Sequence, residues 1–364
     1  MIGIAVDRLC NFPPPGDARR CVCAVVVCYA PDQNVLSQLL DGLTTQVGAV
    51  VIVDNAGQGV GAAELLVPNA TVMLAQPHNI GLAAAQNLGL SWARAHDYTH
   101  VLLLDQDSVP APGMVARLLR VLDSDARIGA VGPQFHDLRE QIAAPFVRIG
   151  FPFNHKLRCG NDLLDSPLGV QDSARFARLQ GRASGEQGQG ADESCVDHET
   201  LLEPGKVVPC DFLIGSGMLI PLSVIDVVGE MDAGLFIDNV DLEWSFRARA
   251  TGFTLVGVCG ARLQHRLGDA RRHFPGWPRG VVVHAPLRLY YMMRNRVLLY
   301  RLPHTPRVWV VQDLPRVLVK LVLFGVLIGP RCKNLHCMLR GLWDGARGCK
   351  GPAPALVQAR AAAR

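Results

Sequence analysis

The sequence lacks the two glycine-rich signatures of the commonest nucleotide-binding loops. Neither GxGxxG nor GxxxxGK[ST] occurs in its 364 residues, so we expect neither a dinucleotide fingerprint nor a P-loop. The net charge is only +4, and so small an excess gives no reason to expect a nucleic acid partner. A nucleotide site, if there is one, must be built in another way.

Cysteine pairs at metal-ligand spacing are also missing. The eleven cysteines include no CxxC pair, and they fall in expected strands or are scattered through expected loops. This distribution predicts reduced thiols in a cytoplasmic protein, and it argues against a disulfide framework or a zinc site.

Long apolar segments are scarce. The longest one near the C-terminus, Val317 to Ile328, is interrupted by Lys320 and is too short to cross a bilayer. The N-terminus shows no basic segment followed by an apolar one, as a signal peptide would. We therefore expect a cytoplasmic protein that lies on a membrane surface rather than spanning the membrane.

What the chain does contain is organised around His100 to Ser108. Its apolar run, Val101 to Leu104, is typical of a strand buried on both faces of a parallel sheet. The run ends in Asp105 and Asp107, and a Pro-x-Pro-Gly turn at 110–113 is expected to stop the strand. Two such carboxylates suit Mg²⁺ or Mn²⁺ held together with phosphates. The alternative interpretation is a solvated turn.

Strands and helices alternate in the first 130 residues. Apolar runs predict strands at 22–28, 49–53 and 71–74, with the 101–104 strand as the fourth, and helical spacing predicts helices at 35–46 and 82–94. A short stretch at 128–132 closes this half. This alternation indicates a parallel sheet with right-handed crossovers. Polar residues follow three of these strands: Asp54-Asn55, Asn79, and the Asp105–Asp107 pair. Such residues along one edge of a sheet predict a nucleotide crevice.

Further candidate residues lie in the second half of the chain. Gly215 and Gly217 flank Ser216, and glycine there would let the backbone approach a ligand, unless the segment is a simple bulge. Asp238 and Asp241 stand three apart at an expected helix start, where capping is the simpler explanation.

Composition divides the chain into regions. We expect a loose leader at 1–20, a sheet domain at 21–285, a helical region at 286–350 and a tail at 351–364. Within the sheet domain, 159–204 is rich in Gly, Gln and acidic residues, which predicts a disordered surface insertion. The last hundred residues are crowded with Arg and Lys. Apolar and basic helices together indicate association with an anionic membrane surface, although packing against the sheet domain or self-association would also explain them.

Four stretches give the sequence a family resemblance. LLLDQDS, LFIDNVDLEWSFRA, HAPLRLYYMMRN and GLWDGARG, in this order, resemble the family 2 glycosyltransferases, and more narrowly their bacterial rhamnosyltransferase subgroup. The resemblance runs from about Val22 to Gly348. It implies an α/β fold of the GT-A type, with a mostly parallel nucleotide-binding sheet flanked by helices. It also implies an inverting reaction, dTDP-L-rhamnose as donor, and Mg²⁺ or Mn²⁺ on the diphosphate.

The resemblance assigns roles to particular residues. It places the donor's nucleotide sugar beside Asp54, Asn79, Gly81, Asn87 and Asp105, and the metal on Asp105, Asp107 and His265. The catalytic base would come from the Asp238–Asp241 segment. Further candidates for contacts with the acceptor or the diphosphate are Ser216, Gly217, Glu243, Trp244, His284, Arg288 and Arg294.

One position departs from the family pattern. Many members carry an acid where this chain has Asn239, and an amide cannot act as a general base. The role would therefore pass to Asp238, which we favour, or to Asp241.

The resemblance leaves several functions open. The expected acceptor is a lipid-linked glycan of O-antigen or exopolysaccharide synthesis, at the inner face of the bacterial inner membrane. Addition of the second rhamnose of a rhamnolipid is an alternative. A non-catalytic, membrane-associated binding subunit with the same fold is a hypothesis of another class. A nucleotidyltransferase is disfavoured, because Tyr29 to Asp32 replaces the Gly-rich basic loop that such enzymes carry after the first strand.

Overall fold

The computed structural model describes residues 21–57, 71–137, 143–159, 207–265, 271–274 and 277–362. The leader at 1–20 lies outside the described residues. So does the insertion predicted at 159–204, apart from Cys159.

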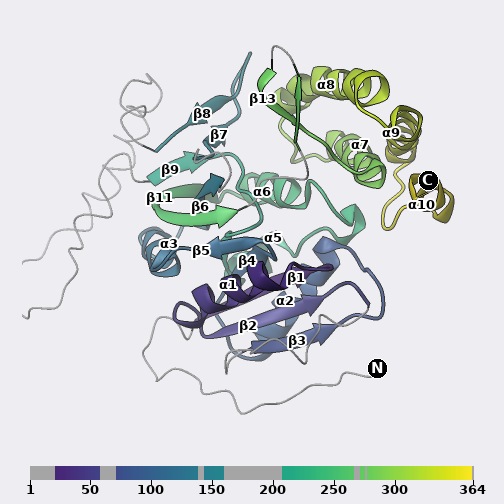
Figure 1. Cartoon of the computed structure of the whole chain (residues 1–364). Helices are drawn as coiled ribbons and strands as arrows, with labels where there is room; N and C mark the ends of the chain where they lie inside the picture. The colour runs from purple at the N-terminus through teal and green to yellow at the C-terminus, as the bar shows by residue number, and fades with distance from the viewer. Residues whose placement is uncertain are drawn as a thin grey trace, which may run out of the picture.

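A nine-stranded mixed sheet forms the centre of the molecule, in the order β3-β2-β1-β4-β10-β6-β11-β5, with β9 also paired to β11 (Figure 1). Its strands are β1 Val22–Cys28, β2 Ala49–Asp54, β3 Thr71–Ala75, β4 His100–Asp105, β5 Ser108–Pro110, β6 Ile128–Asp137, β9 Val207–Cys210, β10 Leu219–Pro221 and β11 Thr254–His265. Strands β3, β2, β1 and β4 are parallel, as predicted. The remaining part is mixed, because β10, β9 and β5 run antiparallel to their neighbours. Two separate hairpins pair β7 Phe146–Arg148 with β8 His155–Leu157, and β12 Arg271–Phe274 with β13 Trp277–Val282.

Helices cover both faces of the sheet, because alternate side chains of each strand point to opposite faces. In β1, Val22, Ala24 and Val26 pack in a cluster with α1 Gln33–Thr44 and α3 Met114–Leu122. Cys23, Val25 and Val27 pack in another, with α2 Leu82–Ala95, α5 Leu222–Val228 and α6 Val240–Ala250. A strand that is buried along its whole length, as β1 is, therefore reads as one continuous apolar run.

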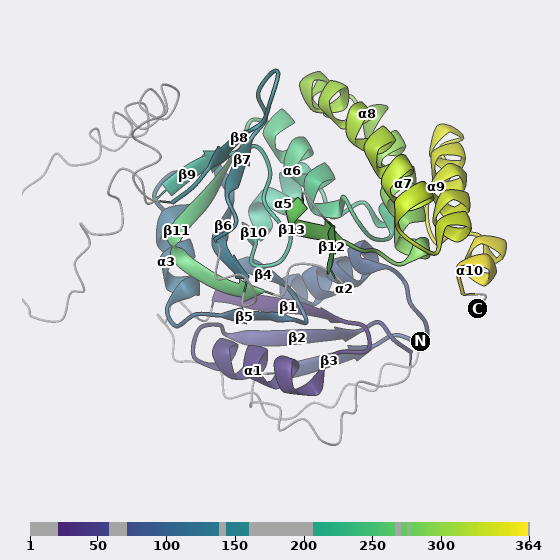
Figure 2. The same cartoon turned by 45° about the horizontal axis from the view of Figure 1, so that its top comes forward.

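The C-terminal helices form a layer beside the sheet domain (Figure 2). They are α7 Pro286–Tyr300, α8 Arg307–Val322, its π-helical continuation Leu323–Leu327 (η5), α9 Arg331–Ala346 and α10 Ala355–Ala362. Glycines let α9 lie close against α7: a Cβ at Gly345 would stand 2.7 Å from the Arg294 carbonyl oxygen. Among the described residues, no helix combines the length and the apolar character needed to cross a membrane.

Two predictions are corrected by the fold. The segment after Asp107 is not only a turn, because Ser108–Pro110 forms β5 and pairs with the end of β11. The thiols are not all reduced, because Cys159 and Cys259 form a disulfide across 100 residues of sequence. Neither pairing has a local sequence signal, since both depend on segments that are distant in the chain.

Candidate active site

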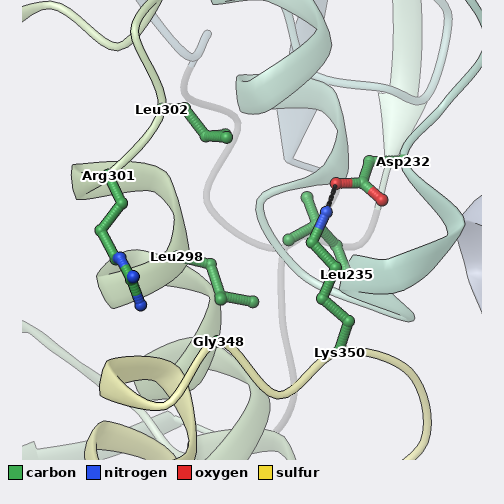
Figure 3. Close-up of a pocket in the computed structure, with 7 residues that line it drawn as sticks. All are labelled: Asp232, Leu235, Leu298, Arg301, Leu302, Gly348 and Lys350. Carbon is green, nitrogen blue, oxygen red and sulfur yellow. Dashed lines mark hydrogen bonds and ion pairs between the residues drawn. The ribbon is translucent and has the colours of Figure 1, made fainter.

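A cleft of about 750 Å³ lies where β1 and β4 end. The N-terminal turns of α2 and α7, the loop before β10 and the loop before α6 complete its lining. Its size is that of ordinary ligand pockets, which span about 300–1,000 Å³. A second pocket of about 160 Å³, shown in Figure 3, lies between Leu235, the end of α7 and the segment after α9. It is too small for a nucleotide sugar, so the larger cleft is the candidate substrate site.

Asp105 and Asp107 stand at the end of β4, half-buried, and both line the cleft. The loop before β10 holds this segment in place. The Ser216 Oγ accepts the Asp105 amide at 3.0 Å and lies 2.6 Å from the Ser108 Oγ. The Gly217 amide donates to the Leu103 carbonyl at 2.7 Å. Ser216 therefore positions the segment that carries the two carboxylates, in addition to the ligand contact predicted for it.

Gly217 has a conformational reason to be glycine. Its φ is +79°, and a Cβ there would meet the Pro133 ring, so no side chain fits. Gly215, not Gly217, lines the cleft. The predicted ligand contact at Gly217 is therefore corrected to a backbone role.

The predicted metal ligands agree with the chemistry of a hard divalent cation. Within the described part of the chain, no group of three His, Cys, Asp or Glu side chains is placed to hold an ion. Asp105 and Asp107 are oxygen ligands of the kind that Mg²⁺ or Mn²⁺ takes, and such an ion commonly completes its shell with phosphate oxygens and water. The backbone of His265 pairs with Ser108, next to Asp107, but its side chain lies outside the described residues.

An asparagine pair forms the neighbouring wall of the cleft. The Asn55 Nδ2 donates to the Asn79 Oδ1 at 3.1 Å, and the Asn55 Oδ1 accepts the Ile80 amide at 2.8 Å. The Asn79 Oδ1 also accepts the Gly81 amide at 2.9 Å. Asn55, Asn79 and Gly81 line the cleft together with Asp105. The structure thus brings three of the five residues predicted beside the nucleotide sugar to one place.

The other two, Asp54 and Asn87, do not line it. Asp54 is fully buried, and its Oδ1 accepts the Ala56 amide at 3.0 Å. The Asn87 side chain is bound to both backbone groups of Met231, at 2.9 and 3.0 Å. Their sequence neighbours Asn55 and Gln86 face the cleft instead. Sequence analysis placed Asn55 on the polar edge of the sheet but assigned the contact to Asp54, and it missed Gln86. In each case the residue that faces the cleft differs by one position from the residue that was chosen.

Asp238 from the loop before α6 and Asp241 from the first turn of α6 reach the same cleft. Arg288 donates to both Asp238 carboxylate oxygens, at 3.1 and 3.2 Å, and so fixes that side chain. The Asp241 Oδ2 accepts the Gly215 amide at 3.0 Å, and its Oδ1 accepts the Leu242 amide at 2.8 Å. Burial raises the pKa of Asp241, and the nearby Asp238 charge raises it further, while the amide hydrogen bonds oppose the shift.

The loop before α6 has a strained backbone. Phe236, Asp238 and Asn239 all have positive φ, between +62° and +66°, which costs free energy for residues other than glycine. Neighbouring elements bind the loop's carbonyl oxygens. The Asn295 Nδ2 donates to the carbonyls of Leu235, Ile237 and Asp238, at 2.9, 2.7 and 2.8 Å. The Leu82 amide binds the Phe236 carbonyl at 2.6 Å.

Arg294 also binds the carbonyl oxygens of this loop, and Arg294 and Asn295 together are named the clamp. Arg294 does not line the cleft. It is fully buried, donates to the Leu235 carbonyl at 2.8 Å, and lies over the Tyr291 ring. The contact predicted between Arg294 and the acceptor or the diphosphate is therefore corrected, because the Arg294 guanidinium binds the loop backbone and does not reach the cleft. Sequence reasoning missed Asn295, although it stands beside Arg294 in the HAPLRLYYMMRN stretch.

Three further candidates have structural partners instead of facing the cleft. Glu243 is buried and bonded to Arg247 at 2.9 Å and to His304 at 2.9 Å. Trp244 is buried, and its indole N–H donates a hydrogen bond to the Gly229 carbonyl at 3.0 Å. His284 stacks near Phe324 and does not line the cleft. Both Glu243 and Trp244 lie in the first turns of α6, where burial of the helix face leaves them no access to a ligand.

Comparisons with known proteins agree with this geometry. Residues 23–159 match the family model described as Glycosyl transferase family 2. The chain is 25% identical over 332 residues to the dTDP-rhamnosyl transferase RfbF of Shigella flexneri, covering 90% of this chain and 96% of that one.

Two solved structures share the fold at low sequence identity. TarS of S. aureus matches with a TM-score of 0.51 and 12% identity, over 93% of this chain and 50% of that one. GalNAc-T7, solved with UDP, GalNAc and Mn²⁺, matches with a TM-score of 0.50 and 11% identity, over 90% of this chain and 56% of that one. The chain thus spans about half the length of each solved protein. Its fold is that of the GT-A glycosyltransferases.

Proposed function

We propose that this chain, whose residues 23–159 match the Glycosyl transferase family 2 model, transfers L-rhamnose from dTDP-L-rhamnose with inversion at the anomeric carbon. The observation that carries the proposal is the presence of two carboxylate pairs in one cleft. Asp105 and Asp107 come from the end of β4, Asp238 comes from the loop before α6, and Asp241 comes from the first turn of α6. A glycosyl transfer from a diphosphate needs both a site for the leaving group and a base for the acceptor. The similarity to RfbF supports rhamnose as the sugar.

The β4 carboxylates are assigned to the leaving group. Asp105 and Asp107 would hold Mg²⁺ or Mn²⁺ against the donor diphosphate, where such an ion stabilises developing negative charge as a Lewis acid. Asn55, Asn79 and Gly81 line the same cleft and are assigned to the nucleotide sugar. Tight packing of Gly81 against the Phe236 carbonyl keeps this wall close to the strained loop.

Asp238 is the proposed base. It would accept the proton of the acceptor hydroxyl while that oxygen attacks the anomeric carbon. Both Asp241 oxygens already accept backbone amides, so Asp241 is assigned to holding the Gly215 loop. The alternative assignment rests on the raised pKa of Asp241, because a general base is most effective when its pKa approaches the working pH.

The acceptor is proposed to be a lipid-linked glycan of O-antigen or exopolysaccharide synthesis, met at the inner face of the inner membrane. Arg288 lines the cleft at the start of α7 and is the candidate contact for an acceptor phosphate. A rhamnolipid receiving its second rhamnose is the alternative acceptor. The basic helical region supports an anionic membrane surface as a partner.

Donor hydrolysis by the purified protein tests the proposal. We expect release of dTDP from dTDP-L-rhamnose, dependent on Mg²⁺ or Mn²⁺, and little release of UDP from UDP-glucose or UDP-galactose. Asp238→Asn should abolish transfer to an acceptor but leave dTDP binding intact. Hydrolysis of a UDP sugar in preference to dTDP-L-rhamnose would contradict the assigned donor.

A non-catalytic binding subunit with the same fold is the second candidate. It would bind dTDP with metal and turn nothing over. The retained carboxylates Asp105, Asp107, Asp238 and Asp241 disfavour it, because a binding role does not need a base. Binding of dTDP by calorimetry without hydrolysis of any donor would establish this alternative.

A further inference from the structure

Helix α8 is apolar on two opposite sides. One side packs against the other C-terminal helices and the sheet domain through Trp309 and Val317, both buried. The other side exposes a row of large apolar side chains, spaced three and four residues apart along α8 and continuing into η5: Val308, Val311, Leu314, Leu318, Val319, Val322, Val326 and Leu327. A helix whose one side already packs in the core normally carries polar residues on the other side.

A second exposed apolar element lies beside the first turns of α8. At the tip of the β7–β8 hairpin, Phe151 is 73% and Phe153 is 80% exposed. The Gln312 side chain of α8 donates to the Gly150 and Pro152 carbonyls of this tip, so the two elements meet, as Figure 2 shows. The exposed row of α8 and η5, together with Phe151 and Phe153, is named the apolar face. Contiguous exposed apolar surface of this kind marks a binding site.

The charge around the apolar face indicates what covers it. Residues 286–364 contain 14 Lys and Arg but only two acids, Asp313 and Asp344. Both acids are buried and bonded to arginines. Arg307, Arg316 and Arg331 are exposed on α8 and at the start of α9. A second copy of this chain would bring two strongly positive surfaces together, which is unfavourable. An anionic lipid headgroup layer matches the charge, and its acyl region matches the row of side chains.

We propose that the apolar face is a membrane-docking surface, with α8 lying in the plane of an anionic bilayer and the hairpin tip inserting Phe151 and Phe153 at the headgroup boundary. The inference deepens the proposed function, on which its biological sense rests, by naming the surface that brings the cleft to a lipid-linked acceptor. The helical pattern of α8 in the sequence predicts neither the hairpin tip nor its contact with α8.

The C-terminal half of α8 packs beside the part of α7 that lines the cleft. The Lys320 Nζ lies 4.0 Å from the Met292 Sδ of α7, and Met292 follows the cleft residue Arg288 by one helical turn.

Flotation with lipid vesicles tests the docking surface on the full chain. The vesicles are phosphatidylcholine alone, or phosphatidylcholine mixed with phosphatidylglycerol. We expect the wild-type protein to float with the mixed vesicles and much less with the neutral ones. Phe151→Ser with Phe153→Ser, and separately Val311→Ser with Leu318→Ser and Val322→Ser, should each reduce bound protein at least about tenfold. Arg307→Gln with Arg316→Gln should weaken binding mainly at low salt.

The matched control is Val227→Ser on α5, since Val227 is also exposed, at 64%, but lies outside the apolar face. It should float like the wild type. All altered residues are exposed, so folding should be retained, which circular dichroism and unchanged donor hydrolysis without vesicles would check. Wild-type protein that ignores mixed vesicles, or variants that still bind them, would overturn the inference. A wild-type dimer that the α8 variant dissociates in sedimentation would overturn it in favour of self-association.

The two proposals can fail separately. Vesicle binding by a protein that hydrolyses no donor would leave the docking surface standing and remove the proposed function. Donor hydrolysis without any vesicle binding would do the reverse.

Discussion

The two regions of this molecule carry opposite charge. The first 285 residues contain 22 Lys and Arg against 30 Asp and Glu, whereas residues 286–364 contain 14 against two. The acids that the sheet domain places in the cleft have chemical roles available to them, because carboxylates bind hard cations and accept protons. The helical region has almost no exposed acid and suits anionic partners. The near-neutral total of +4 therefore conceals a strongly polarised molecule.

The comparison also shows where the two regions depend on each other. The strained loop that bears Asp238 belongs to the sheet domain, but the side chains of Arg294 and Asn295 that bind its carbonyls belong to α7. The helical region thus supports the loop of the candidate active site, as well as being a candidate membrane surface.

Removing one β4 carboxylate should have the largest effect. We expect Asp107→Ala to lower dTDP-L-rhamnose hydrolysis by about 10³-fold or more, because one of the two charged ligands proposed for the metal is lost. Activity assays across a range of Mg²⁺ and Mn²⁺ concentrations would measure it. The control is Asp226→Ala, an exposed acid on α5 paired with Arg94, which should be nearly neutral. Full activity of Asp107→Ala would show that the Asp107 carboxylate, at the end of β4, is not a metal ligand.

Breaking the clamp should have the next largest effect. Asn295→Ala leaves the Ile237 and Asp238 carbonyls without their side-chain donor, while the Leu235 carbonyl keeps only Arg294. We expect kcat to fall about 100-fold and unfolding to become easier by about 3 kcal/mol. Asn334→Ala is the matched control, since the buried Asn334 of α9 likewise binds two carbonyls, of Phe324 and Ile328, away from the cleft. It should lower stability while keeping kcat. Equal kinetic effects of the two changes would mean that Asn295 only supports the fold.

A smaller effect is expected on α2, where adjacent residues face different ways. The Gln86 Oε1 is buried at the cleft without a hydrogen-bond partner among the described residues. Gln86→Leu should raise the donor KM about tenfold, if a donor group satisfies this oxygen. Asn87→Ala should instead destabilise the fold by about 1–2 kcal/mol with little change in KM. Steady-state kinetics and thermal denaturation of both variants would distinguish the two roles, and an unchanged KM for Gln86→Leu would exclude a donor contact.

The buried Lys320 of the helical region should make a modest, pH-dependent contribution to stability. Burial is the main cause that lowers the pKa of Lys320 to about 8; Arg296 and Arg288 lower it further, and Asp238 and Asp313 oppose them. Between pH 8 and the ordinary value of 10.5, the unfolded chain binds the extra proton, so stability should rise with pH in this window.

Replacing the lysine checks this assignment. Lys320→Met should remove that rise and stabilise the protein at pH 7 by about 2 kcal/mol. Denaturant unfolding at several pH values would measure it, with the exposed Lys156→Met as control. A slope that survives in Lys320→Met would assign the pH dependence to another group.

The sequence alone determined the elements whose signal is local. Continuous apolar runs located β1, β2 and β4, because a strand buried on both faces shows no alternation. The same runs placed Asp105 and Asp107 at a strand end, and helical spacing placed Asp241 at the start of α6. The charge of the helical region could be counted directly.

Only the tertiary structure decided the rest, because the deciding contacts join distant parts of the chain. Strand β10 has three residues and inserts between β4 and β6, which no local pattern indicates. The disulfide joins cysteines 100 residues apart. Whether Arg294 meets a substrate or a backbone carbonyl, and whether Asn87 or Gln86 faces the cleft, depends on how α7 and α2 rotate when they pack. Packing depends on the whole fold. The local sequence therefore indicates candidate residues, and the folded structure determines which of them face the cleft.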